Sequence, residues 1–210
     1  NTTPNWTRVG VGEAACGTCH SLPPLAPHPA NPSCSTCHPT IAADRSFPDP
    51  ERHVDGIVDL AALTCTSCHG SGTDPAPPVS TSGSSSTATM GVGAHRSHLA
   101  ASSWRAPISC TECHIVPTGI SSVGHIDTAL PAEITFGARA NADMATPGFA
   151  PATGSCTGVY CHGETLLPGG TLTRPTWTSV GTGQAACGTC HGLPPGGTHV
   201  SIGTCESCHD

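Results

Sequence analysis

The chain has 210 residues, and its 14 acidic side chains outnumber its seven arginines, which gives a formal net charge of −7. Lysine is absent and no basic patch is present, so nucleic acid is not expected as a partner. No apolar run reaches the length of a membrane span. Aromatic residues make up 3% and charged residues 10%, beside 25 glycines and 21 prolines, a composition typical of low-complexity chains. An ordinary hydrophobic core is therefore not expected.

Cysteine pairs with an adjacent histidine recur along the whole chain. Six have two residues between the cysteines: Cys16–His20, Cys34–His38, Cys65–His69, Cys110–His114, Cys187–His191 and Cys205–His209. A seventh, Cys156–His162, has four, and the seven sites use all 14 cysteines. This is the attachment signature of c-type haem, in which both sulfurs form thioethers with the porphyrin and the histidine binds the iron.

The sequence therefore predicts seven covalently bound haem c groups. Sulfur attachment is expected from Cys16, Cys19, Cys34, Cys37, Cys65, Cys68, Cys110, Cys113, Cys156, Cys161, Cys187, Cys190, Cys205 and Cys208. The proximal iron ligands are expected to be His20, His38, His69, His114, His162, His191 and His209. Seven porphyrins would supply the apolar mass that the side chains lack.

Two other uses of 14 cysteines are open. They are the disulfides of a small secreted scaffold and zinc sites built from pairs of Cys-x-x-Cys motifs. Neither explains the histidine after every second cysteine, and seven pairs cannot all be matched two by two. Haem attachment explains both observations.

Residues 4–38 recur at residues 175–209 with a constant offset of 171 and no gap. Both copies hold two haem sites, and the run Ala14–His20 is matched by Ala185–His191. An internal repeat of this length sets the architecture. We expect a two-haem module at 1–38, a three-haem segment at 39–174 with a Ser/Thr-rich loop at 71–89, and a second copy of the module at 175–210.

Few regular elements are expected between the haem sites. A short helix is predicted at residues 91–103, where His95 and His98 are three residues apart and share a face. A short strand is predicted at Glu133–Phe136. The predicted fold class is mostly irregular coil with short helices and few strands, a multihaem c-type cytochrome wrapped around a chain of stacked haems.

Six histidines lie outside the motifs: His28, His53, His95, His98, His125 and His199. Five of them lie in the first two-haem module and the three-haem segment, which together hold five haem sites, so there is one such histidine per haem. All six are therefore predicted as distal ligands of low-spin, bis-histidine irons. Each ligand should be neutral, with its second ring nitrogen donating to a backbone carbonyl or a carboxylate. Asp55 and Asp127, each two residues after a histidine, are candidate acceptors. His95 and His98 are expected to serve two neighbouring haems.

The last haem, at Cys205–His209, is expected to be irregular. If His28 serves the first haem and its repeat mate His199 serves the sixth, no histidine is left for the seventh. A methionine, the amine of Asn1 or water would then complete that iron.

Several segments resemble a known family. Cys156–Gly163 followed by Cys187–Pro195, together with Gly93–Leu99 and Cys110–Pro117, is similar to the CxxxxCH/CxxCH multihaem c-type cytochromes of metal-reducing bacteria. The resemblance covers most of the chain apart from the Ser/Thr-rich loop. It implies bis-histidine haems and extracellular electron transfer, and some multihaem cytochromes of such bacteria polymerise into conducting filaments, or nanowires.

Electron transfer through seven haems is therefore the predicted function, within a filament of identical subunits joined head to tail. Other cytochromes or extracellular electron acceptors are the further partners expected. An electron carrier rather than an enzyme is predicted, because bis-histidine ligation blocks the iron and no cluster of acid–base residues accompanies it. The alternatives are a soluble periplasmic shuttle and a reductase with one open haem.

Haem attachment also predicts the location. Covalent attachment takes place outside the bacterial cytoplasm, and the chain begins at Asn1 rather than with methionine. A mature exported protein is expected, extracellular or at the cell surface rather than periplasmic.

Overall fold

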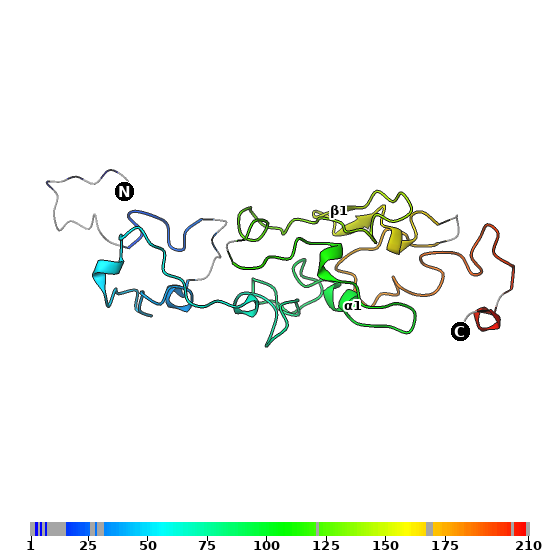
Figure 1. Ribbon diagram of the computed structural model, residues 1–210, viewed down its shortest axis with the longest axis horizontal. Coiled ribbons are helices and arrows are strands. Elements are labelled where there is room, and N and C mark those ends of the chain that lie inside the picture. Colours follow the sequence, from blue (N-terminus) through cyan, green and yellow to red (C-terminus); the bar gives the residue numbers. More distant parts are fainter. Residues whose placement is uncertain are drawn as a thin grey trace. The chain divides into compact units, whose positions relative to one another are not determined.

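The computed structural model describes residues 3, 5, 7, 16–25, 28, 32–120, 122–166, 170–202 and 204–208. Most of these residues lie in turns and irregular segments (Figure 1). The regular elements of these ranges are helix α1 (His95–Leu99), strands β1 (Gly148–Ala150) and β2 (Ser155–Thr157), and the 3₁₀-helices η1 (Cys34–Thr36), η2 (Pro50–Arg52), η3 (Cys65–Ser67), η4 (Cys110–Glu112), η5 (Tyr160–His162) and η6 (Cys205–Ser207). The predicted fold class, irregular coil with short helices and few strands, is confirmed.

Four of the 3₁₀-helices, η1, η3, η4 and η6, begin at the first cysteine of a haem motif. A 3₁₀-helix has three residues per turn, so side chains at positions i and i+3 are eclipsed. Both cysteines of a Cys-x-x-Cys motif therefore project from one side of the turn. The histidine follows at once, and the backbone N–H groups of His38 and His114 donate to the carbonyls of Cys34 and Cys110, both at 2.9 Å.

The first and sixth haem sites use a glycine turn instead. Gly17 and Gly188 directly follow the first cysteine of each site and have φ angles of 88° and 85°, in the left-handed region that favours glycine. A Cβ added at either glycine would lie 3.6 Å from Cδ1 of the leucine after the motif, Leu22 or Leu193. The two copies of the repeat thus share the same local turn at their first haem site.

A small hairpin carries the longer motif. β1 and β2 pair antiparallel, with Phe149 opposite Cys156, the first cysteine of the fifth site. On the other side of β2, the N–H of Cys156 donates to the carbonyl of Pro175 at 3.0 Å, and the N–H of Trp177 donates to the carbonyl of Gly154 at 2.6 Å. The start of the second repeat copy is therefore tied to the fifth haem site.

Helix α1 is shorter than the predicted range of 91–103. Its C-terminal end is capped by the guanidinium of Arg105, which donates to the carbonyls of His98 at 2.9 Å, Ala100 at 3.1 Å and Ser97. The last carbonyls of a helix have no partner within it, so these bonds supply partners from outside the helix. The carbonyl of His98 also accepts from the N–H of Ile108 at 2.9 Å. A cation at this end also complements the helix dipole.

The prediction of a strand at Glu133–Phe136 is wrong. The segment instead follows the η4 turn: the N–H of Thr135 donates to the carbonyl of Cys113 at 2.9 Å, and the N–H of Gly137 donates to the carbonyl of Glu112 at 3.0 Å. A single turn leaves carbonyls without partners, and buried or half-buried carbonyls need them. The N–H groups of this segment therefore bond to the η4 turn of the fourth haem site instead of to a neighbouring strand.

The Ser/Thr-rich segment 71–89 contains no helix or strand. Its N–H and carbonyl groups close turns on themselves: Ser80 N–H donates to the Ser84 carbonyl and Gly83 N–H to the Ser80 carbonyl, both at 2.9 Å. The hydroxyls of Ser84 and Thr89 are 2.7 Å apart, and Ser80 is buried. Local hydrogen bonds within the segment hold its turns.

The chain divides into two compact units. The first combines residues 1–67 with 117–132, and the second combines residues 68–116 with 133–210. The boundaries predicted at 38/39 and 174/175 rest on the repeated haem motifs, whereas these two units rest on contacts within the structure. The predicted boundaries therefore stay a prediction. Within the described residues, no helix is long and apolar enough to cross a membrane.

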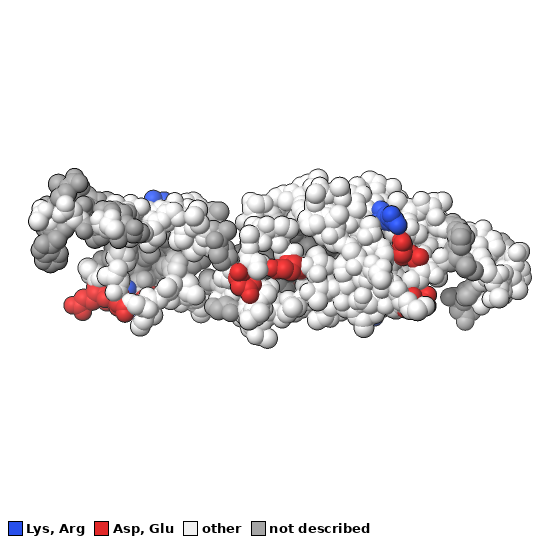
Figure 2. All heavy atoms as spheres, turned by 90° about the horizontal axis from the view of Figure 1, so that it is seen from above, with Lys and Arg blue, Asp and Glu red and all other residues white. Residues whose placement is uncertain are grey.

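The described residues bury very little apolar surface. Val92, Ala140, Ala145 and Val159 are the buried hydrophobic side chains among them, all in the second unit. Large apolar side chains are instead exposed, for example Val54 at 94%, Val123 at 84%, Leu25 at 81% and Leu130 at 80%. The surface in Figure 2 carries few charged side chains. This exposed apolar area is available for burial by a bound group.

Candidate haem-binding sites

Three histidines of haem motifs each face a histidine from outside the motifs. The ring centres are 6.1 Å apart for His38 and His28, 6.2 Å for His114 and His95, and 6.1 Å for His162 and His98. Each pair joins one predicted proximal ligand to one predicted distal ligand. The second, fourth and fifth haem sites are thereby each given a facing histidine.

The spacing of these rings suits one iron between them. A first-row metal ion lies about 2.0–2.1 Å from an imidazole nitrogen, which lies about 1.1 Å from its own ring centre, so two axial imidazoles have centres about 6 Å apart. The ring centres of Phe47 and His53, by comparison, are 3.8 Å apart. The facing pairs therefore leave room for a planar group with a metal at its centre.

A backbone carbonyl fixes the second ring nitrogen of most histidines. Nδ1 lies 2.6–3.0 Å from a carbonyl oxygen in His20, His38, His69, His95, His98, His114, His125, His191 and His199. A carbonyl only accepts, so Nδ1 carries the hydrogen and Nε2 offers its lone pair. That tautomer is the one an Nε2 ligand requires.

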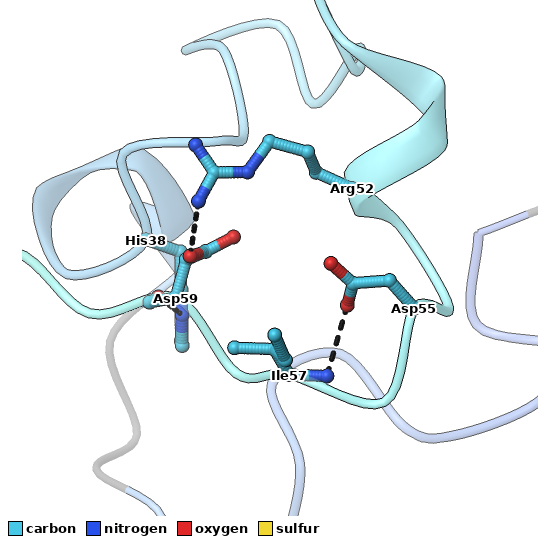
Figure 3. Close-up of polar contacts among 5 residues, drawn as sticks. All are labelled: His38, Arg52, Asp55, Ile57 and Asp59. Carbon is cyan, nitrogen blue, oxygen red and sulfur yellow. Dashed lines mark hydrogen bonds and ion pairs between the residues drawn. The ribbon is translucent and has the colours of Figure 1, made fainter.

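The second site shows how a loop holds a ligand (Figure 3). The Nδ1 of His38 donates to the backbone carbonyl of Asp59 at 2.9 Å. The carboxylate of Asp59 accepts from Arg52 at 2.5 Å, and that of Asp55 accepts from the N–H of Ile57 at 2.9 Å (Figure 3). The ion pair and the turn fix the backbone that positions the imidazole.

At the fourth and fifth sites the two facing ligands come from one helix. His95 and His98 both lie on α1, and their Nδ1 atoms donate to the carbonyls of Val92 and Ala94, both at 2.8 Å. Residues three apart on a helix are about 5–6 Å apart at Cβ. One turn of helix therefore places a predicted distal ligand near each of two predicted proximal ligands.

The indole of Trp177 packs against both of these histidines. Its ring centre is 4.7 Å from that of His95 and 5.5 Å from that of His98. Its Nε1–H donates to the carbonyl of Met90 at 2.8 Å. Gly93 makes the close approach possible, since a Cβ there would lie 1.9 Å from Nε1.

Burial keeps these imidazoles neutral. It lowers the pKa of His162 to about 4 and also lowers the pKa values of His95 and His98. A protonated imidazole cannot bind a metal ion. The fourth and fifth sites therefore hold their histidines in the ligand form.

The other predicted ligands are placed as follows. The ring of His53 stacks on Phe47, and His125 donates from Nδ1 to the carbonyl of Ile120 at 3.0 Å. His20, His69, His191 and His199 lie in turns with their Nδ1 atoms on nearby carbonyls. His209 lies outside the described residues.

Two details of the expected ligand shells differ. Asp127 accepts from the N–H of Gly124 at 2.9 Å, whereas His125 uses a carbonyl, and Asp55 likewise binds the backbone of its own turn. Short aspartate side chains readily bond backbone N–H groups two or three residues away. His28, expected to serve the first haem, faces His38 of the second.

All 14 cysteines, each within the described ranges, are unpaired. The described residues contain no group of three or more His, Cys, Asp or Glu side chains arranged to hold a metal ion. The zinc interpretation finds no support there, whereas a thiol pair beside a histidine is what haem attachment uses.

Trp177 and Arg105 were missed by reasoning from the sequence alone. A signal for Trp177 was present, because the internal repeat places Trp6 at the matching position of the first copy. Nothing in the sequence marks Arg105 as the residue that caps α1.

Comparison with known proteins gives one match. Residues 155–191 match a family described as the Geobacter CxxxxCH...CXXCH motif. No curated protein and no solved structure matches the chain. The match spans the fifth and sixth haem sites, from the residue before Cys156 to His191.

The match supports a multihaem c-type cytochrome. Free cysteine pairs, adjacent histidines and facing imidazoles fit haem c at these sites, and the role that they indicate is that of an electron carrier. Cytochromes of this type are exported from the cytoplasm.

Proposed function

We propose that the chain binds seven haem c groups and conducts electrons along them, as a subunit of an extracellular filament of identical chains joined head to tail. Each bound haem would supply an iron that cycles between two oxidation states one electron apart. The chain itself holds the imidazoles, keeps them neutral and sets the order of the sites.

The facing histidines carry the proposal of electron transfer. A histidine on each side leaves no place for a substrate on an iron, which favours outer-sphere electron transfer over catalysis. The Nδ1–carbonyl contacts prevent the rings from turning, so little reorganisation accompanies a change of charge. His95 and His98 support conduction in particular, since one helical turn sets two haem sites side by side.

The local structure of the cysteine motifs supports the full set of seven haems. The 3₁₀ turns of η1, η3 and η4 and the glycine turns of the first and sixth sites all place two thiols beside a histidine, and η6 holds the cysteines of the seventh motif in the same kind of turn. In the fifth site, Cys156 lies in β2, and Cys161 and His162 lie in η5, so a strand and a 3₁₀ turn carry the motif with the longer spacer.

The internal repeat supports head-to-tail assembly. The two-haem modules at 1–38 and 175–210 place similar haem sites near opposite ends of the sequence. A contact between different surfaces of identical chains is heterologous, and it generates an open filament unless the rotation closes a ring. The exposed apolar side chains favour burial of haem edges between subunits.

Haem content and ligation are tested on the purified holoprotein. Intact mass should show seven haems per chain, and the ferric spectrum should be dominated by low-spin iron. Six haems or fewer, or a large high-spin fraction, would contradict the proposal. Free thiols at Cys156 and Cys161 would remove the fifth site from the set.

Electron microscopy of the same material tests assembly. Filaments with a regular subunit repeat are expected, other cytochromes or extracellular acceptors being the further partners. Monomers or closed oligomers alone would favour a soluble periplasmic shuttle with the same haems, or a reductase if one iron turns over a substrate.

A further inference from the structure

The fourth and fifth haem sites are joined through one backbone segment. The carboxylate of Glu112, in η4, accepts from the N–H groups of Arg139 and Ala140 at 3.0 and 3.3 Å. The N–H of Tyr160, in η5, donates to the carbonyl of the buried Ala140 at 3.1 Å. Both motifs belong to the second compact unit, so the charges near one site can be compared directly with those near the other.

Arg105 places a positive charge beside the fifth site. Its half-buried guanidinium donates at 2.9 Å to the carbonyl of His98, whose ring faces the fifth motif, and also to other backbone carbonyls nearby. Arg52 and Arg96 are each paired with an aspartate, whereas no carboxylate among the described residues forms an ion pair with Arg105. Burial lowers the pKa of His98, and the charge of Arg105 lowers it further.

The cysteines of the two motifs meet different charges. Burial raises the pKa of the Cys161 thiol in the fifth motif, and the positive charges of Arg139 and Arg105 oppose that rise. At Cys113 of the fourth motif, burial raises the pKa and Glu112 raises it further. Glu112 acts on Cys161 in the same direction. The carboxylate therefore reaches both sites, and the two cations act at the fifth.

The fifth site is also the more enclosed of the two. Val159 and Gly163, on either side of η5, are buried, and burial lowers the pKa of His162 to about 4. After the fourth motif, Ile115 and Val116 are 58% and 50% exposed. A ferric haem centre carries a positive charge that the ferrous centre lacks, so burial and a neighbouring cation both favour the ferrous form.

We propose that the fifth haem has a higher reduction potential than the fourth, and that Arg105 is a side chain that raises it. Transfer between these two haems then has a direction: the ferrous fourth haem gives one electron to the ferric fifth haem and becomes ferric itself. The proposal rests on the haem ligation proposed above and adds the site at which electrons collect within this pair.

Stepwise reduction of the holoprotein, followed by electron paramagnetic resonance, tests the order. The ring planes are 69° apart at the fifth site and 22° apart at the fourth, so the fifth should give a highly anisotropic low-spin signal and the fourth a rhombic one. The rhombic component of the fourth haem is the one that His95→Ala removes. We expect the anisotropic signal to disappear at the more positive potential. Earlier loss of the fourth-haem component would overturn the proposal, and this comparison needs no change at the fifth site.

Three substitutions test the part played by Arg105. Arg105→Gln removes the charge and keeps an amide donor, so the anisotropic signal should disappear at a lower potential than in the parent. Arg105→Lys keeps the charge without the planar fork, and Arg45→Gln removes an exposed cation of the first unit, so both should leave that signal near its parent potential.

Two results would refute a charge effect of Arg105. One is an unchanged potential in Arg105→Gln, and the other is an equal shift in Arg105→Gln and Arg105→Lys, which would indicate a change of structure instead. Intact mass and the low-spin spectrum of each variant, recorded beforehand, show separately whether the proposed haem ligation itself fails.

Discussion

The imidazole of His95 meets the indole of Trp177 edge-on, with 4.7 Å between ring centres and 86° between ring planes. The same indole lies 5.5 Å from the ring of His98, tilted by 30°. Edge-to-face aromatic contacts at this range contribute about 0.5–1.5 kcal/mol beyond the burial of area. Trp177, from the second repeat copy, thus packs against two predicted ligands of the three-haem segment.

Replacing Trp177 by leucine should loosen both ligands. We expect the free energy of unfolding to fall by about 2–3 kcal/mol, since a large aromatic side chain and its hydrogen bond to Met90 are lost. Carbon monoxide binding to the reduced protein should rise above that of the parent. Trp104→Leu is the matched control, because Trp104 is 63% exposed and contacts Arg105 instead. Equal effects of the two substitutions would contradict a positioning role for Trp177.

Gly93→Ala should disturb the same contact from the other side. The added Cβ would lie 1.9 Å from Nε1 of Trp177, and Gly93 has a φ of 40° that other residues rarely adopt. A loss of about 2–4 kcal/mol is expected, because neither the indole nor the backbone can yield without moving a ligand. Thermal unfolding followed by haem absorbance measures it. Gly119→Ala is the control, with its nearest atom 3.8 Å away, and a similar loss there would show that the clash is irrelevant.

The sequence predicted the haem chemistry better than the path of the chain. Cysteine and histidine spacing indicated the attachment sites because a single turn of backbone decides that geometry, and the match at residues 155–191 supports it. The pairing of His28 with His38 could not be predicted from the sequence, since spacing along the chain does not determine which two rings come together. The strand predicted at Glu133–Phe136 failed for a similar reason, because carbonyls of the η4 turn compete for its N–H groups.

Arg105→Lys should weaken helix α1. The guanidinium reaches several carbonyls at the end of the helix, and the ammonium of lysine is a point charge without that planar fork. We expect a loss of about 1–2 kcal/mol, given hydrogen bonds to a charged donor. Denaturant unfolding of the holoprotein checks it. Arg174→Lys offers a comparison, since its contact to Glu164 at 3.4 Å is an exposed ion pair of little value, and it should leave stability unchanged.

The two imidazole planes of a facing pair should determine its electron paramagnetic resonance signal. The planes are 10° apart for His28 and His38 but 69° apart for His98 and His162. Nearly parallel axial rings split the iron orbitals strongly and give a rhombic low-spin signal, whereas nearly perpendicular rings give a highly anisotropic one. The ferric protein should show both types. His98→Ala should remove the anisotropic signal and open the fifth iron to carbon monoxide, while His28→Ala should leave that signal in place. An anisotropic signal that survives His98→Ala would contradict the assignment of His98 to the fifth haem.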